Sequence, residues 1–544
     1  MPFKHIFEKT DIKKRQYRAT IMENFLDDWL SHPIYWFSGN DEIITEKYKS
    51  LLDTAVWDTE NTSITYHLAF IILYDQIPRH VYRHGHRHAD GHVYRQEDPE
   101  NAVFIYLQKA LYIHTFVFKS PQFDTYSFTP LEWCFFNLPV RHNNVPSDII
   151  KVINNTWDRV KNTNNTEQYI RFLKSTYNRI QMNQKDYLEY NNSEFNVTSF
   201  IDYIDILANC PLNLKVTHDI EETDIYKNIE AFVIKHNLFK EIIISLSGGV
   251  DSVVCSFVLK KLQEKWKFNL IAVHIDYANR SYKEFEFVKE WCAYIKVPLY
   301  TRHITEINRN DCMEYGMRSI YEDYTKKVRF DTYKAVSDSP NVILGHNYDD
   351  CFENILTNIS NKDKYDNLTG FKESQHIDDI RFLRPILDIK KKDIYLFAYN
   401  NNIPYLCDST PDWSQRGKIR DHVRPTINKW NKEAIPGFFE LANTLSEYEG
   451  IVKNIVSSMI IVAKDVHKLP CSSIIFSKIT WKHIFENLSI YTISQKSLFN
   501  FLQKLEHTYY DLKYQKNKKQ MAILNKNTTI QYSFGDGFLS FRII

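Results

Sequence analysis

One short string of residues has both the types and the spacing that phosphate chemistry needs. It lies between an apolar run at 241–246, an expected strand, and an expected helix, and consists of Ser247, Gly248, Gly249, Val250, Asp251 and Ser252. Two adjacent glycines let the backbone approach an anion closely, and the free N–H groups at a helix start point towards it. The two serines add hydroxyl donors. The string therefore predicts a phosphate-binding loop.

The carboxylate of Asp251 cannot bind phosphate directly, because like charges repel. It is suited instead to hold Mg²⁺ that bridges phosphate groups. The loop lacks the lysine of the GxxxxGK(S/T) pattern, so transfer of a γ-phosphate by a Walker-type site is not the natural interpretation.

A second group of chemical residues follows the apolar run NVIL. His346 comes first, and Asp349, Asp350 and Glu353 follow at helical spacing, so their carboxylates are expected to gather near a helix start. Grouped carboxylates can bind Mg²⁺ or a cationic amine, or act as a general base. The alternative is an ordinary helix start, where aspartate is favoured by the helix dipole. The residues alone leave both interpretations open.

Basic residues form a third group towards residue 430. Arg384 precedes Pro385 before an expected helix, and a later segment carries Arg416, Lys418, Arg420 and Arg424. The three arginines at 416, 420 and 424 would share one helical face. Such a face is usually just solvated, but beside a phosphate site it could clamp phosphates or an RNA backbone.

Three regions with different patterns must position these residues. Residues 1–205 show helical spacing of apolar residues and are predicted to form an all-α domain. In 206–430, β-branched runs alternate with amphipathic helices, which predicts an α/β domain with a doubly wound parallel sheet. Residues 431–544 are predicted to form a small α+β region, with helices near 438–464 and 495–513 and strands joined by a turn at Gly535 and Gly537.

The SGGVDS string resembles the loop of the PP-loop ATP pyrophosphatases, which implies ATP as cofactor and cleavage at its α-phosphate. Further segments follow in order: AVHIDY with His274 and Asp276, KKVRF with Arg329, GHNYDDCFEN, RPIL, CDST and KIRDHVRP. As an ordered set over about 190 residues, they resemble the catalytic domain of tRNA(Ile)-lysidine synthetases. The chain departs from that pattern at Tyr277, Asn347 and Asn354, where the family has His, His and Thr.

This resemblance implies a ligase that forms a C–N bond on tRNA. ATP would adenylate the C2 carbonyl oxygen of a wobble cytidine, and the ε-amine of free lysine would then displace AMP. Asp251 would hold Mg²⁺, while Asp349, Asp350, Glu353 and Arg329 are the further catalytic candidates. ATP would contact the loop residues 247–252 together with residues of the later segments, namely His274, Asp276 and His346.

Two alternatives to this function remain. The first is tRNA thiolation, which is disfavoured because the eight cysteines form no CxxC pair; Cys351, inside the acidic segment, is the one cysteine to test. The second is a non-catalytic nucleotide-binding scaffold. The presence of both the loop and the acidic segment argues against it.

The amino-terminal region contains LAFIILYDQIPRHVYRH, which resembles a bacterial all-helical family of unknown function with a TPR-like helix stack. Gln76 and Arg79 of its DQxPR string are expected to be structural, since Pro78 needs fixed surroundings. The later pattern of that family is reduced here to Pro139, His142 and the two residues after it. The histidine-rich run at 80–92 could bind zinc, but we favour a solvated basic patch that docks RNA.

Composition limits the remaining possibilities. The 544 residues include 68 Lys and Arg against 67 Asp and Glu, so any nucleic-acid site must be a local patch rather than the result of a global positive field. No stretch approaches the roughly 18 apolar residues of a membrane span, and the first residues lack a signal-peptide pattern. The chain is therefore expected to be cytoplasmic and to have no membrane partner; its oligomeric state is open.

Overall fold

A computed structural model describes most of the chain. The described residues are 3–36, 40–82, 99–194, 220–277, 282–360, 370–407, 414–463, 466–488, 490, 493–511, 519–525 and 528–543. The predicted turn at 408–410 and residues 83–92 of the histidine-rich run lie outside them. The chain forms two compact units: Met1–Asn191 with Val273–Glu286 and Leu299–Asp338, and Asn192–Ala272 with Phe287–Pro298 and Ser339–Ile544.

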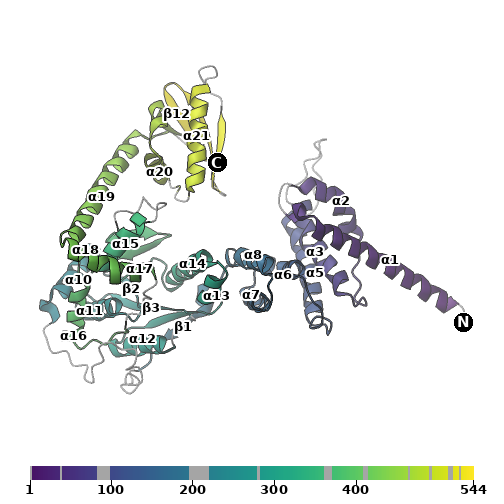
Figure 1. The fold of residues 1–544 in the computed structure, drawn as a ribbon, viewed down its shortest axis with the longest axis horizontal. Helices are drawn as coiled ribbons and strands as arrows, with labels where there is room; N and C mark the ends of the chain where they lie inside the picture. The colour runs from purple at the N-terminus through teal and green to yellow at the C-terminus, as the bar shows by residue number, and fades with distance from the viewer. Residues whose placement is uncertain are drawn as a thin grey trace. The chain divides into compact units, whose positions relative to one another are not determined.

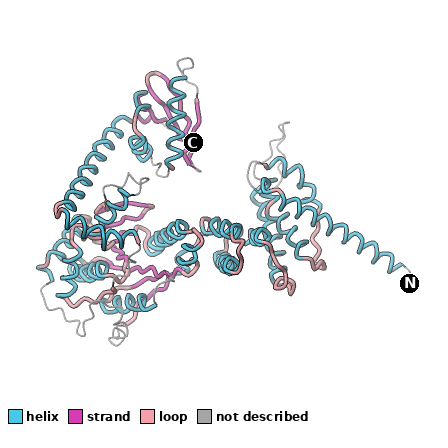
Figure 2. The backbone as a smooth tube through the Cα atoms, viewed as in Figure 1, coloured by secondary structure: helices cyan, strands magenta, loops and turns pink. Residues whose placement is uncertain are grey.

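In the first unit, the regular elements described up to residue 187 are all helical, as predicted (Figure 2). They are α1 (Phe3–Ser31), η1 (Pro33–Trp36), α2 (Asp41–Thr54), α3 (Ile64–Asp75), α4 (Ile77–Val81), α5 (Pro99–Phe118), α6 (Pro130–Asn143), α7 (Pro146–Lys161), α8 (Glu167–Tyr177) and η2 (Gln184–Tyr187). Helix α3 is buried along nearly its whole length: eleven of its twelve residues are buried, and most of them are apolar or aromatic. It forms the centre around which this helical region packs.

A seven-stranded sheet follows, with the order β1-β4-β3-β2-β5-β7-β6. Its strands β1, β2 and β3 are labelled in Figure 1. Its strands are β1 (Leu188–Asn191), β2 (Glu241–Ser245), β3 (Asn269–Tyr277), β4 (Leu299–Ile304), β5 (Asn341–Ile343), β6 (Ser374–Ile377) and β7 (Ile380–Leu383). Strands β2, β5 and β7 pair in parallel, whereas β1 and β6 are antiparallel strands at the two edges. The predicted α/β class is confirmed.

The order of the strands positions the phosphate-binding string. From β2 the chain continues to β3 on one side, whereas β5 lies on the other side of β2. Ligands in open α/β sheets bind beyond the carboxyl ends of the strands at such a reversal. The SGGVDS string follows β2 and the GHNYDD segment follows β5. Because the two strands are parallel, both segments leave the sheet side by side at the carboxyl ends of these strands.

Helices connect these strands: α10 (Asp224–Lys235), α11 (Val250–Trp266), α12 (Tyr282–Ile295), α13 (Arg309–Glu314), α14 (Arg318–Val336), α15 (Tyr348–Ser360) and α16 (Lys391–Asn400). A short element, η4 (Ile220–Glu222), precedes them. The first ten residues of α11 are buried except Asp251, and they include Val253, Val254, Val258 and Leu259. A helical segment that is buried on all its faces belongs to a protein interior, so the part of the helix that follows Asp251 is anchored in the core.

The last part of the chain begins with α17 (Gln415–Lys418), the π-turn η6 (Ile419–Val423), α18 (Arg424–Trp430) and the long α19 (Ala434–Met459). A second sheet, in the order β10-β11-β12-β9-β8, contains β8 (Ile461–Ala463), β9 (Val466–Pro470), β10 (Gln520–Asn525), β11 (Thr528–Gly535) and β12 (Phe538–Ile543). This carboxyl-terminal region also contains η7 (Cys471–Ile475), α20 (Lys478–Asn487) and α21 (Gln495–Asp511). Its helices and strands share one hydrophobic core, which includes Trp481, Leu505 and Leu539. Residues 461–463, expected within a helix, instead form β8.

No helix within the described ranges has the length and apolar character needed to cross a membrane.

One side chain connects three strands at the β1 edge of the sheet. His303, on β4, contacts Asp276 of β3 through Nδ1 at 2.8 Å and Glu189 of β1 through Nε2 at 3.0 Å. The hydrogen bond with Asp276 is the main reason that the pKa of His303 is raised above its ordinary value. The protonated ring therefore stabilises an edge that includes β1, a strand from the region predicted to be purely helical.

We expect His303→Gln to reduce stability more at low pH than at high pH. Because the folded-state pKa is raised, the stabilisation is present below the unfolded pKa of about 6.5 and is lost as the pH rises through the folded pKa. Urea unfolding midpoints of the wild type and the variant at about pH 5.5 and pH 8.5 measure this. His376→Gln, on the opposite edge strand β6, is the control. A loss of stability in His303→Gln that is the same at both pH values would contradict the stabilising role of the protonated ring.

Candidate nucleotide site

The loop between β2 and α11 is shaped by a glycine in the left-handed region. Gly248 has φ +83°, and its carbonyl oxygen accepts a hydrogen bond of 2.9 Å from the N–H of Leu406. A Cβ atom at this position would collide with the side chain of Leu406. Gly249 forms a parallel bridge with the same leucine and precedes the first turn of α11. Gly248 is therefore required by the path of the backbone, whereas Gly249 has an ordinary φ of −70° and only the hydroxyl of Ser247, at 3.7 Å, near its Cβ position.

The two serines close the loop on itself. The hydroxyl of Ser252 donates to the carbonyl oxygen of Gly249 at 3.0 Å and lies 3.2 Å from the hydroxyl of Ser247. It also accepts a hydrogen bond of 3.2 Å from the N–H of Ser247. These bonds hold the loop in one shape, so in this arrangement the hydroxyls predicted to bind an anion also organise the backbone that would bind it.

The segment after β5 packs directly against this loop. A Cβ atom on Gly345 would lie 2.9 Å from the backbone nitrogen of Ser252 and 3.1 Å from Cβ of Asp251. Only glycine allows an approach this close. Gly345 is not recognisable as a site residue from the sequence, because its role depends on β5 being the neighbour of β2.

Asn347 joins the two predicted groups of acids. Its amide nitrogen donates to Oδ1 of Asp251 at 3.0 Å. Its amide oxygen accepts from the backbone N–H groups of Asp349 and Asp350 at 2.9 and 3.1 Å. One side chain thereby satisfies free donors at the start of α15 and binds the acid at the start of α11. In the sequence, this residue stands out only as a departure from the family pattern.

Lys391, at the start of α16, is a site residue that the sequence analysis did not identify. Its ammonium group pairs with Oδ2 of Asp251, and its backbone N–H donates to Oδ2 of Asp349 at 2.5 Å. Burial opposes the charge on this ammonium group, but the carboxylate of Asp251 outweighs it and raises the pKa of Lys391. Its place after the RPIL segment, in a run of three lysines, was the available signal.

The acids of α15 are buried and paired with arginines. Only 2% of Glu353 is exposed, and its two carboxylate oxygens each accept a 2.9 Å hydrogen bond, from Nε of Arg420 and Nε of Arg416. Arg416 also pairs with Asp350, and Arg424 pairs with Asp349. A buried carboxylate without a partner is strongly unfavourable. The predicted arginine face therefore exists, and here it is directed at the acids.

The shape of the segment 415–430 explains how three arginines spaced four residues apart reach one helix. Ser414 caps α17 by accepting a hydrogen bond of 3.0 Å from the N–H of Gly417. Pro425, in the first turn of α18, has no N–H to donate to the preceding turn, and that turn is the π-turn η6. Lys418, predicted with the arginines, is exposed on the same segment.

His346 and Arg384 form a separate pair in the same unit. Nε of Arg384 donates to Nδ1 of His346 at 3.1 Å, and the imidazole stacks on Phe371 with centroids 4.3 Å apart. Arg384 is 5% exposed, and burial lowers the pKa of its guanidinium to about 10. Its Nη1 donates to the carbonyl oxygen of Lys372 at 2.6 Å. Arg384 is therefore placed beside His346 rather than on the arginine face of 415–430.

Three predicted residues lie in the other compact unit. His274 is buried on β3, with its ring stacked on Phe285 at 6.3 Å, and Asp276 is paired with His303. Arg329 lies on α14, with its guanidinium 5.9 Å from the ring centroid of Phe330. Their roles in binding or catalysis stay predictions.

The thiol proposed for a thiolation reaction lies in apolar surroundings. Cys351 is 5% exposed and belongs to a cluster with Ile355 and Ala442. Burial raises the pKa of its thiol, which disfavours the thiolate that such chemistry requires. Among the residues that the structure describes, no three His, Cys, Asp or Glu side chains form a group placed to hold a metal ion.

The loop, the strand order and the paired acids define the class of this part of the chain. Residues 221–428 match the model of a family described as a PP-loop domain, and the chain carries such a domain.

The relatives make the similarity more specific. The chain is 26% identical to a tRNA(Ile)-lysidine synthase of Oceanobacillus iheyensis over 56% of this chain and 67% of that protein. It is 26% identical to a tRNA(Ile)-lysidine synthase of Clostridioides difficile over 41% of this chain and 49% of that one. The chain thus spans between about half and two thirds of the length of these relatives. Among solved structures, the match to a tRNA thiolase from Methanococcus maripaludis covers 41% of this chain and 79% of that one, with 18% identity and a TM-score of 0.35.

The geometry of the loop predicts the effect of a single methyl group. We expect Gly248→Ala to lower the free energy of unfolding by more than the ~1–2 kcal/mol that a left-handed backbone costs an L-residue, because the methyl group also meets Leu406. Gly537→Ala is the matched control, since its φ is +81° and nothing lies within 4 Å of its Cβ position. Urea unfolding of both variants tests this; equal losses of stability would show that the contact with Leu406 is unimportant.

Proposed function

We propose that the chain is an ATP-dependent tRNA-modifying ligase of the lysidine-forming type. In the first step, the C2 carbonyl oxygen of a wobble cytidine attacks the α-phosphate of ATP, and pyrophosphate leaves. In the second step, the ε-amine of free lysine attacks C2, AMP leaves and the amine gives up a proton. Adenylation converts a poor leaving oxygen into a good one and divides a difficult substitution into two easier steps.

The observation that carries the proposal is the junction between the loop and the acidic helix. Asn347 holds Asp251, at the phosphate-binding loop, to the start of α15, where Asp349 and Asp350 begin the helix that bears Glu353. A nucleotide phosphate and a cationic amine can thus be bound by adjoining elements of one unit. The PP-loop match and the two lysidine synthase relatives support the assignment of ATP and tRNA as substrates.

Binding of ATP would depend first on the backbone. The four acids at the junction are paired with four cations, Lys391, Arg416, Arg420 and Arg424, so the side chains leave little net charge to attract phosphates. The free N–H groups after Gly249 and the dipole of α11 remain available for the pyrophosphate part of the nucleotide.

The residues present fit Mg²⁺ as a companion of the nucleotide. Mg²⁺ in nucleotide sites is commonly held by one or two carboxylates together with phosphates and water, rather than by a cage of protein ligands. Asp251, 18% exposed and adjoining the loop, would hold it once Lys391 moves from Oδ2. When bound, the ion neutralises charge on the departing pyrophosphate. Lys391 then becomes a cation available for a phosphate oxygen.

The acids of α15 would select and prepare the amine. The lysine side chain carries an ammonium group that can compete with a guanidinium for the oxygens of Glu353, which here accept from two arginines. A carboxylate next to that ammonium group can also take the proton that the amine must lose before it attacks. The arginines released in the exchange could contact the phosphate of the adenylate or the RNA backbone.

Nucleoside mass spectrometry tests the proposal. Total tRNA is incubated with the full chain, Mg·ATP and isotope-labelled lysine, and the digested nucleosides are analysed. We expect labelled lysine on cytidine with the wild type and none with Asp251→Asn, which keeps the shape of the side chain but removes its charge. Asp393→Asn is the matched control, because Asp393 is an exposed acid in the first turn of α16 and should be dispensable.

Other results would separate the alternatives. Pyrophosphate release without incorporation of lysine would retain the adenylation step and overturn lysine as the nucleophile. A sulfur-containing base in the presence of a sulfur donor would favour thiolation. A chain that releases no pyrophosphate with any tRNA would support the scaffold instead.

A second variant separates the two steps. We expect Glu353→Gln to lower lysine incorporation by about tenfold to a thousandfold, because Glu353 is proposed to bind and deprotonate the amine. The release of pyrophosphate that depends on tRNA should fall much less. Glu373→Gln is the control, since Glu373 is also paired with two basic residues, Lys235 and His236, outside the proposed site. Equal loss of both activities with Glu353→Gln would argue for a purely structural role.

A further inference from the structure

The helical region at the start of the chain contains a pocket rich in arginine. Its volume is about 690 Å³, a size typical of sites for small organic molecules. Its polar lining includes Gln76, Arg79, Arg141, His142, Arg171 and Arg179. These residues come from α4, α6 and α8 and the residues that flank them. The pocket is therefore built by several helices of one unit and is not a groove along a single helix.

Two sequence motifs that the proposed function does not use meet at this pocket. Asp75 is 2% exposed, and its oxygens lie 2.8 and 3.0 Å from Nδ1 of His142, 67 residues away in the chain. Arg79 approaches the same carboxylate at 3.3 Å, and the amide of Gln76 donates to it. The expected structural role of Gln76 and Arg79 is thus visible, but it fixes residues that line a cavity.

The guanidinium groups keep unused donors. Nε of Arg79 and Nε of Arg141 are both buried and have no hydrogen-bond partner. Arg141 donates from Nη1 to the hydroxyl of Ser175 at 3.0 Å and packs on the ring of Phe172. Burial, followed by the nearby charge of Arg179, lowers the pKa of Arg141 to about 10. Buried donors without acceptors are rare in proteins and are costly, so an acceptor that enters the pocket would relieve an existing cost.

The charges that line this pocket do not balance. Arg171 has its own partner, Glu167, at 3.0 Å, and Asp75 faces both His142 and Arg79. Arg141 and Arg179 form no ion pair with a carboxylate of the described residues. A guanidinium offers several donors in a plane. Two such groups, one from α6 and one from the turn after α8, suit a doubly charged oxyanion such as a phosphate monoester.

Apart from Gln168 and Ser175, the remaining walls of the pocket are apolar or aromatic. Trp36, Phe135, Leu138 and Phe172 contribute to them. A ligand with an anionic group and a ring would therefore contact the arginines with the first and the apolar wall with the second. This is usual for pockets with a few polar groups on an apolar lining.

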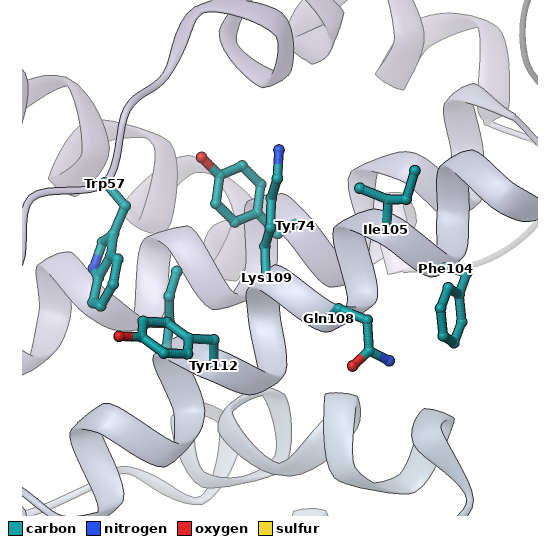
Figure 3. A pocket seen from close by; sticks show the side chains of 8 residues that line it. Trp57, Tyr74, Phe104, Ile105, Gln108, Lys109 and Tyr112 are labelled. Carbon is teal, nitrogen blue, oxygen red and sulfur yellow. The ribbon is translucent and has the colours of Figure 1, made fainter.

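A second pocket of the same helical region provides a contrast. Figure 3 shows Trp57, Phe104 and Tyr112 along this pocket, whose one lysine, Lys109, lies 4.7 Å from the ring centroid of Tyr106. Its charge already faces an aromatic ring, and no guanidinium lines it. The excess of positive charge thus belongs to the arginine pocket and is not a general property of these helices.

We propose that the arginine pocket binds a nucleoside 5′-monophosphate group, with the phosphate between Arg141 and Arg179 and the base against the apolar wall. This group could come from a free nucleotide or from the 5′-phosphorylated end of an RNA. It is a binding site separate from the phosphate-binding loop, and it does not depend on the ligase activity.

Isothermal titration calorimetry of the full chain tests this proposal. Uridine 5′-monophosphate is the probe, because an adenine nucleotide would also occupy the expected ATP site, and uridine is the control without phosphate. We expect binding of the monophosphate and none of uridine. Arg179→Ala, which alters an exposed side chain, and Arg141→Lys, which keeps the charge but loses the planar fork, should each weaken binding by about tenfold or more.

Lys109→Ala removes one positive charge from the neighbouring pocket and should change the affinity by less than about twofold. A 5′-phosphorylated trinucleotide, compared with its 5′-hydroxyl form, identifies the source: tighter binding than the mononucleotide indicates an RNA end, whereas weaker binding indicates a free nucleotide. The proposal is overturned if the monophosphate does not bind at millimolar concentration, or if uridine binds equally well. It is also overturned if the arginine variants have no more effect than Lys109→Ala. Circular dichroism confirms that each variant is folded.

Discussion

The amide of Asn347 connects two helix starts whose carboxylates would otherwise repel each other. Asp251 begins α11, while Asp349 and Asp350 begin α15, and the parallel pairing of β2 and β5 brings these two helix starts to one edge of the sheet. Carboxylates gathered away from water are strongly unfavourable unless hydrogen bonds and opposite charges compensate. Much of the structure that follows α15 in the chain supplies this compensation.

The positions of α16 and of the segment 415–430 follow from that requirement. Lys391 places its ammonium group on Asp251, and three arginines spaced four residues apart reach the acids of α15. A regular α-helix could not continue unchanged through Pro425, so the π-turn before it maintains the path of the segment. The acidic helix and the basic segment are therefore one electrostatic unit, although about sixty residues separate them in the sequence.

Local properties of the site were predictable from the sequence, whereas the partners of its residues were not. The order strand, SGGVDS and helix depends on glycine conformation and apolar patterning, which neighbouring residues determine. The role of Gly345 depends on which strand lies beside β2, and that of Lys391 on how α16 docks. Likewise, the pairing of Asp276 with His303, which is 27 residues away, depends on β3 and β4 and is not visible in the sequence around either residue.

The same limitation applies to the fold. The alternation of strands and helices predicted the parallel sheet, but β1 is a four-residue strand at its edge, within a region dominated by helical spacing. Its pairing with β4 is supported by the side chain of His303 rather than by a strong strand pattern of its own. Short edge strands carry little periodic signal, so only the tertiary structure identifies them.

Charge balance distinguishes the two sites of this chain. At the phosphate-binding loop, every acid already has a cation, so a nucleotide with its metal ion must exchange existing ion pairs for new ones. Exchange of that kind can couple binding to movement of the segment 415–430, because the arginines lose partners when the acids take new ones. In the arginine pocket, by contrast, Nε of Arg79 and Nε of Arg141 are already desolvated without acceptors. An anion there would satisfy donors whose desolvation has already occurred, so it can bind without displacing an ion pair.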